Sequence, residues 1–357
     1  MSRITEPWSP SDGDAMTARE IAFDAALRVE KGAWAEEVLR GAVAGLDPRD
    51  ADLAWELVLG PLRVQSQLDH LIRLYSGKAA KLDAEVRAAL RIGIYQLRYL
   101  DRIPPHAAVS ASVDLVKRAR KRSAMGFVNA VLRKVNRDPV AWPSRDVELA
   151  APAWLLARWE KAFGTEPATG IARAFLNPPA APGQDPGAAA IVPLLGVEPG
   201  MSVLDLCAAP GNKTRQLVGA GGIVVAADRY GQRLRQVEAE DRVVLDATLP
   251  LPFVKTFDRI LVDAPCSGTG TLGRNPEIKW RISPADLTDL ATRQRAILRQ
   301  ALSALAPGGR LVYSTCSLEK EENEEVVHSV CRDRVVEEGY RLPGQEPGDG
   351  FWHAVIA

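Results

Sequence analysis

The stretch that decides the fold is "MSVLDLCAAPGNKT", residues 201–214. Its apolar run is typical of a buried strand, small residues around Gly211 then form a turn, and a helix is expected to begin near Lys213. In a doubly wound sheet, ligands bind at the carboxyl ends of strands, where small residues let the backbone approach the ligand closely. The stretch therefore indicates a nucleotide-like cofactor, although a tight connection between strand and helix also explains the small residues.

Four further β-rich runs follow this stretch: "GIVVAAD" (222–228), "RVVLDA" (242–247), "FDRILVDAP" (257–265) and "GRLVYSTCS" (309–317). Helical segments lie between several of them. The clearest is residues 284–305, whose apolar face is predicted to include Leu298 and Leu305. Alternation of this kind predicts a mostly parallel sheet covered by helices, in an α/β domain of Rossmann-like type.

The preceding half of the chain has a helical pattern without strand signals. In "VRAALRIGIYQLRYL" (86–100), apolar residues recur at helical spacing with basic residues between them, and five to seven helices are expected over residues 17–137. We divide the chain into four parts. They are a flexible leader (1–16), an all-α domain (17–140), a linker with a Pro- and Gly-rich passage at 176–187 (141–187), and the α/β domain (188–357).

Composition limits the classes of function. The chain has 357 residues, of which 46% are apolar and 25% charged, and no run reaches the roughly 18 apolar residues of a membrane helix. We therefore expect a cytoplasmic protein that makes no membrane contact. Its four cysteines include no CxxC pair, which argues against a disulfide framework and a structural metal. A monomer is the simplest expectation.

The net charge of zero conceals a basic first half. Residues 17–140 carry 21 Lys and Arg against 15 Asp and Glu, and "KRARKR" is the densest basic cluster. Its cations are candidates for contacts with RNA phosphates, or they form a solvated helix face. They are Lys117, Arg118, Arg120, Lys121 and Arg122.

Acidic residues recur at the ends of the strands that follow the first one. Asp228 can accept hydrogen bonds from ribose hydroxyls, Asp246 can meet an adenine amino group, and Asp263 can face the substrate. The alternative is that each caps a helix or lies at a solvated strand end. Neither GxGxxG nor a Walker motif follows the first strand, so S-adenosyl-L-methionine is favoured over a dinucleotide or a nucleoside triphosphate.

Two cysteines lie just past neighbouring strands, Cys266 in "DAPCSGTG" and Cys316 in "YSTCS". A thiolate that adds to carbon 6 of a pyrimidine makes carbon 5 nucleophilic enough to accept a methyl group, and a second thiol can assist breakdown of the adduct. A free thiol is mostly protonated at neutral pH, so the site must lower the pKa of the attacking cysteine. Cys331, on a helical stretch, is expected to pack in the core.

The motifs "DLCAAPGNKT", "DAPCSGTG", "RNPEIKWR" and "YSTCSLEKEENEEVV" resemble those of the Sun family of RNA 5-methylcytosine methyltransferases. That family has a seven-stranded S-adenosylmethionine-dependent fold. The segment "LRIGIYQLRYLDRIPPHAAVSASVDLVKRA" resembles the NusB-type RNA-binding domain, and the pairing resembles enzymes that methylate cytosine in 16S rRNA. The resemblance covers nearly all of the chain from about Thr17.

The resemblance implies a role for each matching residue. Cys316 matches the nucleophile, Cys266 the cysteine that assists release, and Asp263 an acid beside the substrate and cofactor. Asp228 and Asp246 match the ribose and adenine acids, and Lys213 and Pro265 would shape the crevice. The cofactor loop falls on Cys207, Ala208, Ala209, Pro210, Gly211, Asn212 and Lys213.

The chain departs from the family pattern in three places. The passage 176–187 stands where the family carries a small RNA-binding subdomain, and the segment between Asp228 and Asp246 is short enough to imply a trimmed helix. Asn212 replaces a second glycine, a mild change even if it needs a positive φ. The run "LEKEENEE" (318–325) is expected to begin a solvated helix.

Three functions remain for the sequence. The first is an active RNA cytosine-C5 methyltransferase. The second is an RNA-binding or ribosome-assembly protein with a shortened, weakly active or inactive methyltransferase domain, which the missing subdomain motivates. The third, a methyltransferase for amines or proteins, leaves Cys266 and Cys316 unexplained.

Overall fold

The computed structural model describes residues 16–77, 81–177 and 185–357 and divides them into two units. Unit 1 contains the described residues up to Arg158, Leu176, Asn177 and the segment Arg274–Trp280. Unit 2 contains Trp159–Phe175 and the remaining C-terminal residues. Apart from Met16, the predicted leader lies outside the described residues, as do residues 178–184 of the Pro- and Gly-rich passage.

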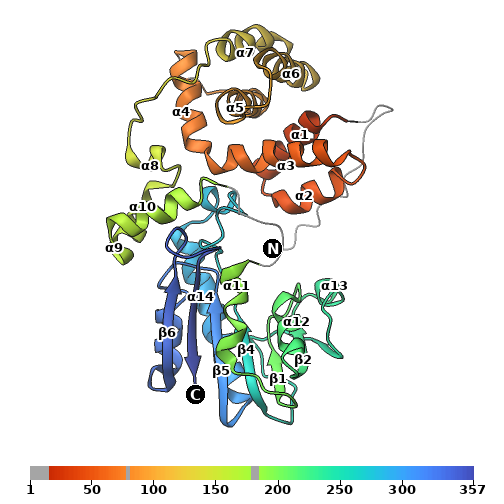
Figure 1. Cartoon of the computed structure of the whole chain (residues 1–357), viewed down its shortest axis with the longest axis vertical. Coiled ribbons are helices and arrows are strands. Elements are labelled where there is room, and N and C mark those ends of the chain that lie inside the picture. Colours follow the sequence, from red (N-terminus) through yellow and green to blue (C-terminus); the bar gives the residue numbers. More distant parts are fainter. Residues whose placement is uncertain (1–15, 78–80, 178–184) are drawn as a thin grey trace. The chain divides into compact units, whose positions relative to one another are not determined.

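Unit 1 is helical, as the sequence predicts (Figure 1). Seven α-helices fall within the predicted helical region, and a short helix, α8, follows them. No strand occurs among the described residues of this unit. The helices are α1 (Ala18–Glu30), α2 (Ala35–Ala42), α3 (Pro48–Arg63), α4 (Gln65–Ser76), α5 (Ala84–Tyr99), α6 (Pro105–Arg118), α7 (Met125–Leu132) and α8 (Arg145–Glu148), with the 3-10 turn η1 (Arg122–Ala124) before α7.

Local signals start these helices and apolar packing holds them together. Thr17 caps α1, because its hydroxyl accepts a hydrogen bond from the Glu20 amide while the Glu20 carboxylate accepts one from the Thr17 amide. Asp47 caps α3 by accepting from the Arg49 amide. One apolar core joins α1 to α7, and Leu68 and Leu90 are fully buried within it.

The segment Arg274–Trp280, from the C-terminal half of the sequence, is part of unit 1. The Lys279 ammonium donates to the carbonyl oxygens of Arg63 and Ala150, at 2.7 Å each. The Trp280 indole donates to the Leu62 carbonyl at 2.7 Å, and the Ala35 amide donates to Glu277 at 3.0 Å. Three polar side chains of "RNPEIKW" therefore hold this segment against the backbone of the helical unit.

Replacing Lys279 with methionine should lower the free energy of unfolding by about 1 to 3 kcal/mol, because two buried carbonyl oxygens lose their donor. Burial lowers the pKa of Lys279 to about 7, and the Arg63 charge acts in the same direction. The folded chain therefore releases this proton at a lower pH than the unfolded chain does. Between about pH 7 and 10 the unfolded state binds more protons, so the contribution of Lys279 to stability should rise with pH.

Thermal unfolding of the wild type and Lys279→Met, measured at several pH values in that range, tests this prediction. The difference between the unfolding midpoint temperatures of the wild type and Lys279→Met should increase as pH rises. Lys117→Met, which removes an exposed lysine of the same unit, serves as the control and should show a constant gap. A gap for Lys279→Met that stays constant across the range would contradict the assignment.

Unit 2 is built on one sheet of seven strands in the order β3-β2-β1-β4-β5-β7-β6. Strands β1 to β5 run parallel, while β7 is antiparallel to both β5 and β6. The predicted mostly parallel sheet and Rossmann-like fold are confirmed. The strands are β1 (Ser202–Asp205), β2 (Ile223–Asp228), β3 (Asp241–Val244), β4 (Phe257–Asp263), β5 (Leu305–Thr315), β6 (Val335–Arg341) and β7 (Phe351–Ile356).

Helices cover both faces of this sheet (Figure 1). Side chains alternate along each strand, so Val203 and Leu261 pack with one set of helices, whereas Leu204 and Ile260 pack with the other. The first set contains α11 (Pro186–Ala189), η2 (Val192–Leu195) and α12 (Asn212–Gly219); the second contains α14 (Pro284–Ser303) and α15 (Glu324–Cys331). The remaining elements are α9 (Ala153–Phe163), α10 (Thr165–Ala174), α13 (Gly231–Leu234), η3 (Ile278–Trp280, in unit 1) and η4 (Arg332–Arg334).

The structure corrects some sequence predictions and confirms others. Helix α14 ends at Ser303, and Leu305 is the first residue of β5 rather than part of the helix face. The residue patterns did not reveal β6, because it is an edge strand with several exposed side chains and little apolar alternation. The trimmed helix expected between the second and third strands is α13, which has four residues.

Candidate active site

The predicted cofactor loop, Cys207–Lys213, connects β1 to α12. Gly211 precedes the helix with φ +107°, and a Cβ there would lie 3.1 Å from the Val237 backbone. A side chain would thus be both strained and obstructed at this position. Asn212 begins α12 without a positive φ, so its replacement of a second glycine requires no left-handed backbone conformation.

Asp205, at the end of β1, is a candidate site residue that the sequence analysis missed. It is 1% exposed, and its Oδ2 accepts a hydrogen bond from the Thr214 hydroxyl at 2.7 Å, while Oδ1 has no partner among the residues that the structure describes. Burial raises the pKa of Asp205 to about 7 despite this hydrogen bond, and the nearby Asp263 charge also contributes. The position at a strand end is the signal that would have identified it.

Asp228 is the last residue of β2 and Asp246 lies two residues past β3, so both are at strand ends, as expected. Asp228 is buried and accepts hydrogen bonds from the amides of Ala209 at 3.1 Å and Tyr230 at 2.8 Å, so it ties the cofactor loop to β2. Asp246 accepts from the hydroxyl and amide of Thr248, which lower its pKa, and it lies 3.4 Å from Arg229. Neither is the N-cap residue of an α-helix in unit 2. Their contacts with ribose and adenine stay predictions.

Asp263, the last residue of β4, forms the central ion pair of the site. Its Oδ2 lies 2.7 Å from the Lys213 ammonium, and its Oδ1 accepts from the Ser314 hydroxyl at 2.9 Å. Burial alone would lower the pKa of Lys213, but the charges of Asp263 and Cys316 together raise it. The Lys213 ammonium therefore stays protonated beside both Asp263 and Cys316.

The two cysteines predicted at strand ends meet in the structure. Strands β4 and β5 are parallel neighbours, with Asp263 in register with Ser314, so the chain segments that follow them lie together. The Sγ atoms of Cys266 and Cys316 are 3.3 Å apart. The hydrogen bond with Cys316, then burial and the Glu322 charge, raise the pKa of Cys266 well above its usual range. Cys331 packs in the core on α15, as predicted.

The run 318–325 is not the start of a solvated helix, and this prediction is wrong. Helix α15 begins only at Glu324. The side chains of Glu319, Glu322 and Asn323 are buried, with at most 2% exposure. Hydrogen bonds make this burial possible: Glu319 accepts from the Trp159 indole, and Asn323 accepts from the Thr315 hydroxyl.

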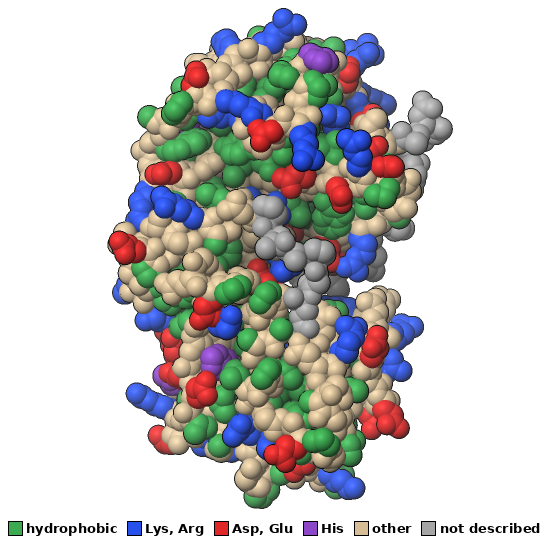
Figure 2. Space-filling view, viewed as in Figure 1, with side chains coloured by type: hydrophobic (Ala, Val, Ile, Leu, Met, Phe, Trp, Pro, Cys, Tyr) green, Lys and Arg blue, Asp and Glu red, His purple; other side chains and the backbone are tan. Residues whose placement is uncertain are grey.

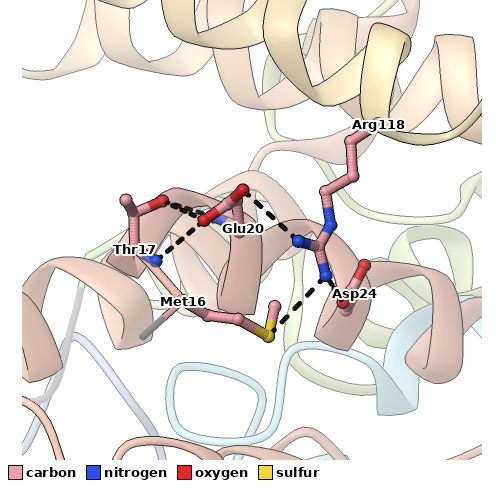
Figure 3. A network of polar contacts seen from close by, with 5 residues as sticks. All are labelled: Met16, Thr17, Glu20, Asp24 and Arg118. Atoms are coloured by element: carbon pink, nitrogen blue, oxygen red, sulfur yellow. Dashed lines mark hydrogen bonds and ion pairs between the residues drawn. The ribbon is translucent and has the colours of Figure 1, made fainter. Parts of the chain in front are cut away.

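The basic cluster predicted to contact RNA is partly neutralised. Arg118 ends α6 and lies within ion-pair distance of Glu20 and Asp24 of α1 (Figure 3). Lys121 pairs with Asp83 at 2.8 Å and lies 3.8 Å from Glu85. Lys117, Arg120 and Arg122 are exposed and form no ion pair within the described part of the chain.

The excess positive charge of unit 1 does not gather into one patch on the face shown in Figure 2, where basic and acidic side chains are mixed. Contact between this unit and RNA phosphates stays a prediction, and it is strongest for Lys117, Arg120 and Arg122.

Comparison with known proteins identifies the family. Residues 192–354 match the family described as 16S rRNA methyltransferase RsmB/F, and residues 16–137 match the NusB family. The probable ribosomal RNA small subunit methyltransferase B of Bacillus subtilis is 30% identical over 397 aligned positions, which cover 89% of this chain and 88% of the relative. The chain belongs to the RsmB/F family of methyltransferases.

Other relatives agree with this membership. Ribosomal RNA small subunit methyltransferase B of Cronobacter sakazakii is 31% identical over 92% of this chain and 95% of its own length. The crystal structure of PH0851 superposes with a TM-score of 0.75 at 20% identity, over 97% of this chain and 100% of that one, and supports the fold. The alignments with the two relatives exceed 357 positions, so both relatives carry residues that this RsmB/F chain lacks.

As an RsmB/F methyltransferase, the protein uses S-adenosyl-L-methionine as its methyl donor. One observation fits such a group beside Cys207–Lys213. The Asp205 Oδ1 atom, at the end of β1, is buried and has no hydrogen-bond partner among the described residues. The residues that can hold the cofactor are those of this loop together with Asp205, Asp228, Asp246 and Asp263.

None of the helices within 16–77, 81–177 and 185–357 has the length and apolar character needed to cross a membrane. Across the same ranges, no three His, Cys, Asp or Glu side chains gather in a way that could hold a metal ion.

Proposed function

We propose that this protein transfers a methyl group from S-adenosyl-L-methionine to carbon 5 of a cytosine in RNA, with 16S rRNA as the substrate. The observation that carries the proposal is the 3.3 Å separation of the Cys266 and Cys316 sulfurs, beside the Lys213 and Asp263 ion pair. A methyltransferase for amines or proteins needs no nucleophilic thiol, whereas carbon 5 of cytosine does need one. The names of the relatives supply the rRNA part of the proposal.

Cys316 acts as the nucleophile. Its thiolate adds to carbon 6 of the cytosine, forming a carbon-sulfur bond and moving the electron pair of the ring double bond toward carbon 5. Carbon 5 then accepts the methyl group that the cofactor supplies. The charge of the Lys213 ammonium, paired with Asp263, also interacts with Cys316. In this proposal Asp263, whose carboxylate is bound by Lys213 and Ser314, contacts the base edge.

Cys266 assists release. After methyl transfer, carbon 5 still carries its original proton. A water molecule acting as base takes this proton, the electron pair of the broken C–H bond re-forms the ring double bond, and the carbon-sulfur bond to Cys316 breaks. The position of Cys266 beside Cys316 suits it to help this elimination. Loss of the thiolate from carbon 6 then restores Cys316 for the next cycle.

Transfer of labelled methyl groups to 16S rRNA tests the proposal directly. Purified protein with labelled cofactor should label the rRNA of a strain that lacks this gene, and sequencing after bisulfite treatment should locate the product as 5-methylcytosine. Labelling at another base or atom would contradict cytosine-C5 specificity. Absence of transfer to any RNA would contradict the proposed enzyme.

A second function is an RNA-binding or ribosome-assembly protein with a weakly active or inactive methyltransferase unit. The residues that its relatives carry and this chain lacks favour it. RNA binding would then persist without cofactor and weaken steeply with salt. Calorimetric titration with S-adenosylhomocysteine separates the two, because a catalytic chain must bind it. For either function we infer a cytoplasmic monomer that meets RNA through its NusB-type unit.

A further inference from the structure

Glu322 is a buried carboxylate between β5 and α15, with no exposed surface. Its Oε1 accepts hydrogen bonds from the Ser267 amide at 2.8 Å and from the Gln294 side chain at 3.0 Å. Its Oε2 accepts from the hydroxyls of Ser267 and Ser317, at 2.5 Å each. All four donors are neutral, and Glu322 forms no ion pair within the described residues. The hydrogen bonds that this buried carboxylate needs therefore come from neutral groups.

The donors to Glu322 come from the two segments that carry the cysteines. Ser267 directly follows Cys266, and Ser317 directly follows Cys316. Gln294, on α14, also donates to the Pro265 carbonyl at 2.9 Å, so the residues on both sides of Cys266 are held. One carboxylate, with one amide side chain, thereby fixes both cysteine-bearing segments.

The charges around the two sulfurs differ in sign. The Glu322 carboxylate opposes ionisation of Cys266, after the larger effects of the Cys316 hydrogen bond and burial. The Lys213 ammonium, which is paired with Asp263, interacts with Cys316. The titratable and charged groups that face the pair are Tyr313 from β5, Asp263 from β4, Lys213 from α12 and Glu322; Arg295 of α14 acts on Tyr313.

We propose that Glu322 is the positioning residue that makes the two cysteines unequal. Its carboxylate holds both segments in place and keeps the proton on Cys266, which donates its S–H to Cys316, so Cys266 is the later of the two sulfurs to lose its proton. The other thiol proton is exchanged with solvent, and no other reactant is needed. The assignment of nucleophile and release residue rests on the proposed function, but the inequality of the two thiols does not.

The test is the pH dependence of alkylation of each thiol in the full-length, reduced protein without RNA or cofactor. Iodoacetamide labelling from about pH 6 to 10, followed by trypsin, places Cys266 on peptide 260–274 and Cys316 on peptide 311–320, so mass spectrometry follows each separately. In the wild type, Cys316 should react at a lower pH than Cys266. Cys266 reacting first would overturn the proposal without any variant.

Glu322→Gln removes the charge while keeping the shape of the side chain. The pH midpoint of Cys266 alkylation should fall by about half to one pH unit, and the alkylation rate of Cys266 near pH 8 should rise by about threefold to tenfold. Glu325→Gln is the matched control, because Glu325 is an exposed carboxylate of the same run, and both of its profiles should equal those of the wild type. A folded Glu322→Gln protein with an unchanged Cys266 midpoint would overturn the proposal.

Methyl transfer by the same variants separates this inference from the proposed function. Glu322→Gln should lower kcat more than it changes KM for RNA, because it disturbs the thiols and not the RNA-contacting unit. If the wild type transfers no methyl group but its two thiols differ in alkylation and respond to Glu322→Gln, the role of Glu322 is supported and the proposed enzyme activity is contradicted. If methyl transfer is normal but Glu322→Gln leaves both alkylation profiles unchanged, the enzyme activity is supported and the role of Glu322 is contradicted.

Discussion

Cys316→Ala should abolish methyl transfer, lowering turnover by roughly four or more orders of magnitude, the scale on which loss of a nucleophile reduces enzyme activity. Without the thiolate at the end of β5, nothing adds to carbon 6, and carbon 5 of cytosine stays too weak a nucleophile to take the methyl group. The measurement is transfer of labelled methyl from the cofactor to 16S rRNA at saturating cofactor.

Two controls make this result specific. Binding of S-adenosylhomocysteine to Cys316→Ala, measured by calorimetry, should stay within about twofold of the wild type, because the cofactor loop lies after β1 rather than β5. Cys331→Ala removes a thiol that packs in the core and should retain transfer. Activity in Cys316→Ala above a hundredth of the wild-type rate would show that another group forms the adduct or that none forms.

Cys266→Ala should have a different effect, which is accumulation of a covalent complex between protein and RNA. Cys316 can still attack and methylation can proceed, but the step that removes the carbon 5 proton loses its assisting thiol, so the adduct persists. A slower band that survives denaturing electrophoresis and disappears on ribonuclease treatment would be the signature. We expect most of the RNA-bound protein to be trapped after one turnover.

The double variant Cys266→Ala with Cys316→Ala supplies the necessary control. It should form no such band, because the bond to carbon 6 requires Cys316. A band that persists in the double variant would assign the adduct to another residue. Rapid turnover by Cys266→Ala with no trapped complex would show that release does not depend on Cys266.

These two predictions concern different steps of one proposed cycle, and Glu322 connects them. The buried carboxylate binds the residues that follow both cysteines, so it affects attack and release together. A change at Cys266 or Cys316 acts on one sulfur only. The alkylation profiles therefore show whether the two thiols differ in reactivity in the protein without bound RNA.

Local sequence signals were sufficient for the central part of the fold. Strands β1 to β5, the turn at Gly211 and the positions of Cys266 and Cys316 just beyond neighbouring strands could all be predicted from short apolar runs and the residues that end them. The reason is that the carboxyl ends of parallel strands meet at one edge of a sheet, whatever the rest of the chain does. The helices of unit 1 followed from apolar spacing in the same way.

Residues that depend on distant partners could not be predicted. The acidic composition around Glu322 indicated a solvated helix, but donors from residues 267, 294 and 317 satisfy its carboxylate in the interior. The sequence predicted Arg118 as a phosphate contact, but in the structure its guanidinium forms ion pairs with Glu20 and Asp24 of α1. Lys279 lies far along the chain from the carbonyls of Arg63 and Ala150 that it binds.

The sequence by itself therefore determined the family, the two kinds of unit and most of the candidate site residues, because these depend on short motifs and periodic patterns. Only the tertiary structure decided which charges are buried, which are neutralised, and which carboxylate holds the two thiols 3.3 Å apart. Burial and hydrogen bonding are set by segments that are remote in sequence, and those contacts exist only once the chain has folded.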